Sequence, residues 1–179
     1  MSKGSKNQAN LAKLFTAWTG WEFHSVPRSG GLRWGRDMRV IGDLICDIDH
    51  AEEFPFSIET KVRKPKMGRK SKIIRNKVEI GDLLIKKKDG FIWESWMQCT
   101  EDATRGGKSP LMCLRNDRMA STTYFTFLEK QTGMAICNEL SNSKNYLLTN
   151  NKLNLFITTT DWLFKLPSEK VFDIVRKML

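Results

Sequence analysis

The part of this sequence that most constrains its fold lies between residues 42 and 64. It contains two apolar runs typical of β-strands, residues 43–48 and 54–62, joined by the polar, acidic turn at 49–53. Runs of this length separated by a short polar connection indicate two strands that can pair within one sheet. The chain is therefore expected to build its core around a sheet that includes both runs.

Side chains alternate between the two faces of a strand. In the second run, Ser57, Glu59 and Lys61 consequently share one face, so that a carboxylate and an ammonium project side by side. If the two runs pair, Asp43, which opens the first run, can approach Glu59 from the neighbouring strand. This spacing predicts a cluster of two acids and a lysine on one face of the sheet.

Such a cluster fits a magnesium-dependent phosphodiesterase. Mg²⁺ is usually held by one or two carboxylates together with waters and phosphate oxygens, and Asp43 and Glu59 can supply the carboxylates. A metal ion there would activate a water and neutralise charge on the phosphate. Lys61 could hold the attacking water or stabilise the pentacovalent phosphorus. The competing interpretation is a solvated charge pair across strands, because acid-x-Lys triplets are frequent by chance.

Composition restricts the class of protein. A chain of 179 residues with 40% hydrophobic residues suits one folded domain with a core. No apolar run approaches the roughly 18–20 residues that span a bilayer, and the N-terminus lacks the apolar segment of a signal peptide, so we expect a cytoplasmic protein that does not act at a membrane. The net charge of +10 favours a polyanionic partner but does not by itself distinguish DNA, RNA and an acidic membrane surface.

The cysteines do not indicate a zinc site. The four of them are far apart and form no C-x-x-C pair, and the chain has only two histidines. Cys46, Cys113 and Cys137 lie in apolar runs and are predicted to be reduced core residues.

Hydrophobic periodicity predicts the other elements. Helices are expected at residues 3–19, where Leu11, Leu14, Phe15 and Trp18 form one stripe; at 91–104, with Trp93, Trp96, Met97 and Thr100 on one stripe; and at 168–179, with Val171, Ile174, Val175 and Met178 inward. Further strands are expected at residues 21–26, 111–114, 124–128, 135–137, 146–149 and 153–159. The result is a mixed α/β core with a sheet covered by helices.

Two basic segments flank the candidate cluster. The turn at residues 27–31 carries Arg28 and Ser29 beside two glycines, and such a backbone can approach a phosphate closely, although a plain tight turn is an equally good interpretation. Residues 61–77 contain nine Lys or Arg and no acid. They are either a solvated loop or an electrostatic arm for a nucleic-acid backbone. The residues predicted to contact a nucleic-acid backbone are Arg28, Ser29, Arg63, Lys64, Lys66, Arg69 and Lys70.

These motifs, taken in order, resemble the PD-(D/E)XK nuclease superfamily, and within it the small Holliday junction resolvases and resolvase-like phage endonucleases. The matching segments are Lys3-Gly4-Ser5 before the first helix, Gly20–Phe23, Val26–Gly30, Gly42-Asp43-Leu44-Ile45, the E-x-K strand Phe56–Lys61, Gln98 in the later helix, and Gly107–Leu111. The resemblance covers about residues 3–118.

The resemblance implies a restriction-endonuclease-like mixed central sheet flanked by helices, with a β-rich C-terminal extension. It divides the chain into a nuclease core at residues 1–118, carrying a basic insertion near 63–88, and an extension at 119–179 packed on the same domain. Asp43 and Glu59 would bind Mg²⁺, with Mn²⁺ as an alternative, Lys61 would be catalytic, and Gln98 would support the site. The family usually places a glutamate on the first helix, where this chain has Gln8.

We therefore expect a Mg²⁺-dependent endodeoxyribonuclease acting on branched or duplex DNA. The more specific hypothesis is a Holliday junction resolvase that acts in DNA recombination or repair. A homodimer is implied by the resemblance. Asp37 is the rival of Asp43 as a metal ligand, and Asp43 is preferred because it is attached to a strand. The alternative function is a non-catalytic DNA-binding protein on a nuclease fold, motivated by the neutral first helix. An RNA-binding module ranks below both because the chain lacks the aromatic-rich strand motif of such modules.

Overall fold

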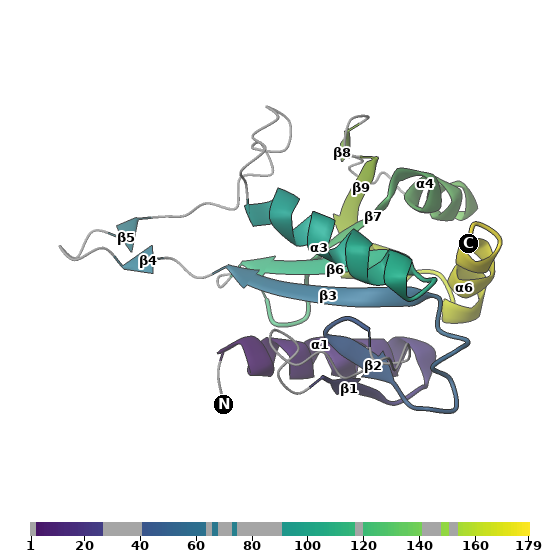
Figure 1. Cartoon of the computed structure of the whole chain (residues 1–179), viewed down its shortest axis with the longest axis horizontal. Coiled ribbons are helices and arrows are strands. Elements are labelled where there is room, and N and C mark those ends of the chain that lie inside the picture. The colour runs from purple at the N-terminus through teal and green to yellow at the C-terminus, as the bar shows by residue number, and fades with distance from the viewer. Residues whose placement is uncertain are drawn as a thin grey trace.

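The computed structural model (Figure 1) describes residues 3–26, 41–63, 66–67, 73–74, 91–116, 120–140, 148–150 and 154–179. Its helices are α1 (Lys3–Thr19), α3 (Phe91–Arg105), α4 (Lys130–Glu139), α5 (Thr160–Leu163) and α6 (Ser168–Arg176). Its strands are β1 (Phe23–Ser25), β2 (Leu44–Cys46), β3 (Phe56–Arg63), β4 (Lys66–Met67), β5 (Ile73–Ile74), β6 (Ser109–Asn116), β7 (Phe125–Glu129), β8 (Leu148–Asn150) and β9 (Leu155–Thr159).

Over the described ranges, seven strands form one mixed sheet in the order β1-β2-β3-β6-β7-β9-β8. The central pair, β3 and β6, is parallel and in register from Phe56 opposite Ser109 to Arg63 opposite Asn116. The other neighbours in this sheet pair antiparallel. Among the strands that the structure describes, β4 and β5 form a separate two-stranded sheet. Since parallel strands need a crossover, the chain crosses between β3 and β6 through α3.

Helices cover both faces of the central strands. On one face, Leu11 and Phe15 of α1 pack in the same buried cluster as Phe56 and Ile58 of β3. On the other face, a second cluster joins α3 to β6 and β7. Figure 1 shows α1 and α3 on opposite sides of the β3–β6 pair. Phe56 and Ile58 share one face of β3, as predicted from its sequence, and the predicted mixed α/β fold with a sheet flanked by helices is confirmed.

The C-terminal third continues the same sheet. Strand β7 pairs with β6, β9 pairs with β7, and β8 forms the far edge. Side chains of α4 and α6, among them Ile136 and Phe172, join the cluster on the α1 face. The described part of residues 119–179 therefore widens the sheet and adds side chains to the cluster on the α1 face.

One predicted strand is wrong. Residues 135–137 lie inside α4, not in a strand. Gly133 of this helix packs so closely against the Phe156 ring that a Cβ atom there would lie 2.1 Å from it. Contact with β9 therefore settles the conformation of a segment whose short apolar run is ambiguous by pattern alone.

Two helices have a buried face that differs from the predicted one. In α3 the buried residues are Ile92, Ser95, Trp96, Cys99 and Ala103, while Met97 is 41% exposed. Trp96 is buried as predicted, but the small side chains of Ser95, Cys99 and Ala103 share its face, whereas the prediction followed the large apolar residues. In α6 the inward residues are Val171, Phe172 and Val175, and Met178 lies beyond the helix end and is exposed.

The cysteines are free thiols in the described structure. Cys46 and Cys113 are buried as predicted, and Cys137 is only partly buried. Cys99, which the sequence did not assign to the core, is fully buried between α3 and the sheet. Burial raises the pKa of Cys46 to about 11 and that of Cys113 to about 12, so both remain protonated at neutral pH.

Candidate active site

The backbone before β2 fixes Asp43 against β3. The Asp43 N–H donates to the Ile58 carbonyl at 2.7 Å, and the Asp43 carbonyl accepts from Val26 N–H at 3.0 Å. Gly42 makes this approach feasible, because its φ is +89° and a Cβ atom there would lie 2.5 Å from the Ile58 oxygen. The Asp43 carboxylate in turn accepts a hydrogen bond from the Thr60 N–H at 2.9 Å.

Glu59 and Lys61 lie on the face of β3 that α3 covers. Glu59 is 3% exposed and Asp43 is 6% exposed, so both acids are withdrawn from solvent. The Lys61 ammonium forms an ion pair with Glu59 and donates to Gln98 Oε1 at 3.1 Å. The structure thus brings together four of the predicted site residues, Asp43, Glu59, Lys61 and Gln98, from β3, α3 and the segment before β2.

The electrostatic state of Glu59 follows from this enclosure. Burial and the neighbouring charge of Asp43 raise its pKa to about 7, even though Lys61 acts in the opposite direction. One ammonium therefore does not compensate the two buried acids, and the site favours an additional positive charge. Buried groups with strongly perturbed pKa values are concentrated at functional sites.

This donor set fits a divalent cation. Over the described ranges, no group of three or more His, Cys, Asp or Glu side chains is arranged to hold a metal ion. Mg²⁺ needs only one or two carboxylates when waters and substrate phosphates complete its shell. Asp43 and Glu59 are such a pair, and because burial and the charge of Asp43 raise the pKa of Glu59, a bound cation would stabilise its ionised form. The residues that would hold Mg²⁺ or Mn²⁺ are therefore Asp43 and Glu59.

The first helix contributes a buried residue that the sequence did not single out for the site. Gln8 is partly buried on α1. Its neighbour Asn7 is 3% exposed and donates from Nδ2 to Thr60 Oγ1 at 2.8 Å. Sequence reasoning missed this contact because nothing in the local pattern distinguishes two adjacent amides. The nearest acid after α1, Glu22, is exposed and pairs with His24 at 3.6 Å.

The other predicted DNA contacts are less fully placed. Arg63 ends β3 and Lys66 begins β4. Predicted site residues that lie outside the described residues are Arg28, Ser29, Asp37, Lys64, Arg69 and Lys70.

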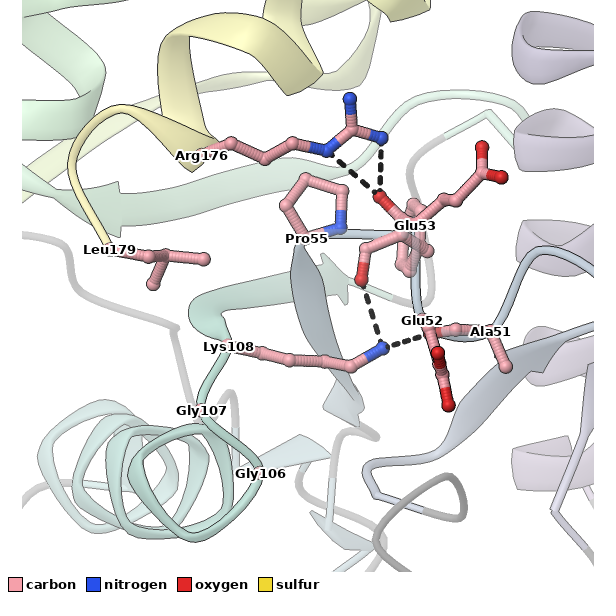
Figure 2. Close-up of a pocket in the computed structure, with 10 residues that line it drawn as sticks. Ala51, Glu52, Glu53, Pro55, Gly106, Gly107, Lys108, Arg176 and Leu179 are labelled. Atoms are coloured by element: carbon pink, nitrogen blue, oxygen red, sulfur yellow. Dashed lines mark hydrogen bonds between the residues drawn. The ribbon is translucent and has the colours of Figure 1, made fainter.

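A pocket of about 310 Å³ lies elsewhere, beside the start of β3 (Figure 2). The Lys108 ammonium donates to the carbonyls of Ala51 and Phe54 at 2.7 and 2.9 Å, and the Arg176 guanidinium donates to the Glu53 carbonyl at 2.6 Å. Both cations donate hydrogen bonds to main-chain oxygens and thereby hold the turn before β3 in place. Glu59 lies four residues beyond Pro55, about 13 Å along an extended strand, so this pocket is separate from the carboxylate cluster.

The sequence was compared with models of protein families, and one family model matches nearly the whole chain. The model of the family described as "Phage putative PDDEXK endonuclease" matches residues 1–173. The chain belongs to this family. The match extends over the nuclease motifs and most of the C-terminal third, and it confirms membership of the PD-(D/E)XK nuclease superfamily. Membership of this family indicates that the PDDEXK protein is a nuclease, an enzyme that hydrolyses phosphodiester bonds.

No curated protein and no solved structure matched the chain. Among the described helices, none has the length and apolar character that crossing a membrane requires.

Proposed function

We propose that this PDDEXK protein is a metal-dependent DNA endonuclease whose active site consists of Asp43, Glu59 and Lys61. The observation that carries the proposal is the convergence of two buried acids with one lysine, where burial and the charge of Asp43 raise the pKa of Glu59 to about 7. A surface charge pair would not have buried acids. The burial therefore argues against the interpretation of Glu59 and Lys61 as a solvated pair.

Each residue has a defined part in the proposed chemistry. Asp43 and Glu59 bind Mg²⁺ or Mn²⁺, which when bound supplies Lewis-acid stabilisation of the phosphate and lowers the pKa of a water. Lys61, held by Glu59 and Gln98, donates a hydrogen bond that orients the attacking water. The attacking water loses a proton to solvent as its oxygen bonds to phosphorus, the bond between phosphorus and the 3′-oxygen breaks, and the 3′-oxygen takes up a proton from solvent. The products are a 5′-phosphate and a 3′-hydroxyl.

The proposed substrate is DNA, because the chain carries a net charge of +10 and the basic run at residues 61–77 directly follows the candidate catalytic strand. Arg28, Ser29 and the cations of this run would contact the phosphate backbone. The sharper proposal is a resolvase that acts as a homodimer, so that two sites cut opposing strands of a four-way junction. It is supported by the resemblance of the ordered motifs.

Cleavage of three labelled substrates tests the proposal: a four-way junction, a linear duplex and a single strand, each with Mg²⁺, Mn²⁺ or EDTA. Paired, symmetric cuts confined to the junction would identify a resolvase. Metal-dependent cuts in the linear duplex would identify a general or sequence-specific endonuclease and exclude the sharper form. Cleavage that is equally fast in EDTA would refute metal dependence.

A second candidate function is a DNA-binding protein without catalysis. It is favoured by the neutral first helix, which has Gln8 at the position where the family usually has a glutamate. This alternative predicts salt-sensitive binding to DNA and no cutting of any of the three substrates with either metal ion. Binding that persists without cleavage would therefore select it over the endonuclease.

A further inference from the structure

A buried hydrogen-bond chain lies behind the carboxylate cluster, on the α1 face of β3. Asn7 Nδ2 donates to Thr60 Oγ1 at 2.8 Å, and the Tyr124 hydroxyl donates to Asn7 Oδ1 at 3.0 Å. Asn7, Thr60 and Tyr124 are 3%, 7% and 0% exposed. Asn7 thus links Tyr124 to Thr60, the residue between Glu59 and Lys61, so the chain joins three segments far apart in the sequence.

Thr60 connects this chain to the active site through its backbone. Its side chain accepts from Asn7 on one face of the sheet, while its N–H donates to the Asp43 carboxylate at 2.9 Å. A shift of Thr60 would therefore move the amide that holds Asp43. It would also move Glu59 and Lys61, because they are its immediate neighbours along β3.

Tyr124 is itself held rigidly. Its N–H donates to the Thr160 hydroxyl at 3.2 Å, and its carbonyl accepts from the Thr160 N–H at 3.0 Å. Thr160 begins α5, after β9. The chain of contacts therefore runs from the C-terminal third of the molecule, through α1, to the strand that carries the acids.

We infer that Asn7, Thr60 and Tyr124 are positioning residues that fix Asp43, Glu59 and Lys61 for metal binding and cleavage. This inference rests on the proposed function. Fully satisfied buried polar networks rigidify their surroundings, and outer-shell hydrogen bonds orient the groups that bind a metal. In this chain the first helix supports the site by a neutral hydrogen bond to the strand. The C-terminal third supplies the tyrosine that fixes that bond.

The test compares three variants with wild-type protein. Thr60→Val removes the acceptor while keeping the shape of the side chain, Thr60→Ser keeps the hydroxyl, and Tyr124→Phe removes only the phenolic oxygen. Affinity for Mn²⁺ alone is measured by calorimetry, and kcat and KM are measured on the cleaved DNA substrate, well below the unfolding temperature. Thr60→Val is expected to lose about tenfold to a hundredfold in Mn²⁺ affinity and in kcat, with KM unchanged. Tyr124→Phe is expected to lower Mn²⁺ affinity and kcat as well. Thr60→Ser, which keeps the hydroxyl, is expected to retain the wild-type Mn²⁺ affinity and kcat.

Trp18→Phe is the matched control. It removes another hydrogen bond of α1, from Trp18 Nε1 to the Leu166 carbonyl at 2.9 Å, but eleven residues or about 16 Å along the helix from Asn7. It should lower stability without changing Mn²⁺ affinity or kcat. If Thr60→Val binds Mn²⁺ and cleaves as wild-type protein does, the positioning role is refuted and the proposed function stands. If wild-type protein neither binds Mn²⁺ nor cleaves, the proposed function fails and this inference fails with it.

Discussion

Replacing Glu59 with Gln should stabilise the metal-free protein at neutral and alkaline pH while removing its cleavage activity. Burial and the charge of Asp43 raise the pKa of Glu59, and they outweigh the attraction of Lys61. The ionised form of Glu59 is therefore unfavourable in the folded chain without a bound cation. Gln is close to Glu in shape and carries no charge, so the substitution relieves this penalty but removes a proposed metal ligand.

The size and direction of the effect follow from linkage. The pKa of Glu59 is about 7 in the folded protein and 4.5 in its ordinary state. Between these values the folded state holds a proton that the unfolded state has lost, so the free energy of unfolding falls as pH rises from about 4.5 to about 7. At 1.36 kcal/mol for each pKa unit, the loss amounts to about 3 kcal/mol. This loss of stability is absent at pH values below the ordinary pKa of Glu59 and complete at pH values above its raised pKa in the folded protein.

Urea unfolding in EDTA, followed by tryptophan fluorescence at acidic and alkaline pH, measures this difference. Glu59→Gln should be more stable than wild-type protein at alkaline pH by up to about 3 kcal/mol, and the difference should shrink on acidification. Adding Mg²⁺ or Mn²⁺ at alkaline pH should stabilise wild-type protein and not the variant, because ligands that bind only the folded state stabilise it by mass action.

Glu139→Gln is the matched control for charge removal. Glu139 is exposed and pairs with Lys170, which lowers its pKa, so removing its charge should not stabilise the protein at alkaline pH. The reasoning would be refuted by a Glu59→Gln variant that is less stable than wild-type protein in EDTA at alkaline pH. Metal ions that stabilise the variant as much as wild-type protein would contradict the assignment of Glu59 as a ligand.

Two glycine substitutions test how the backbone supports the site and the sheet. Gly42→Ala should cost about 1–3 kcal/mol of stability and abolish Mn²⁺ binding, because φ is +89° and the new Cβ would lie 2.5 Å from the Ile58 carbonyl oxygen. Calorimetry and cleavage assays measure the outcome. Unchanged Mn²⁺ affinity in this variant would contradict the prediction. Gly133→Ala should lower stability by about 1–3 kcal/mol despite the better helix propensity of Ala, because the methyl group would overlap the buried Phe156 ring. Urea unfolding measures that loss, and a stabilised variant would refute the packing argument.

The sequence predicts the part of this molecule in which local pattern and chemistry agree. The alternation of residues 56–62 assigns Glu59 and Lys61 to one face, and the structure places them there under α3. The apolar stripe of residues 3–19 likewise predicts α1, and its Leu11 and Phe15 are fully buried. In both segments the periodicity is long enough to leave no competing assignment.

Other features depend on contacts that no local pattern contains. The conformation of α4 is fixed by the fit of Gly133 against Phe156, so its short apolar run was misassigned to a strand. The contacts of Asn7 depend on Thr60 and Tyr124, which lie 53 and 117 positions away in the chain. A single sequence carries no signal for contacts at that separation.

The role of Lys61 is the most direct test of the central claim. Lys61→Ala and Lys170→Ala each remove one ammonium, but Lys61 pairs with buried Glu59, whereas Lys170 pairs with exposed Glu139. Both variants would be assayed for metal-dependent cleavage and for DNA affinity. We expect Lys61→Ala to lose about a hundredfold or more in cleavage rate with DNA affinity largely retained, and Lys170→Ala to cleave as wild-type protein does. Full cleavage activity in Lys61→Ala would contradict the proposed active site.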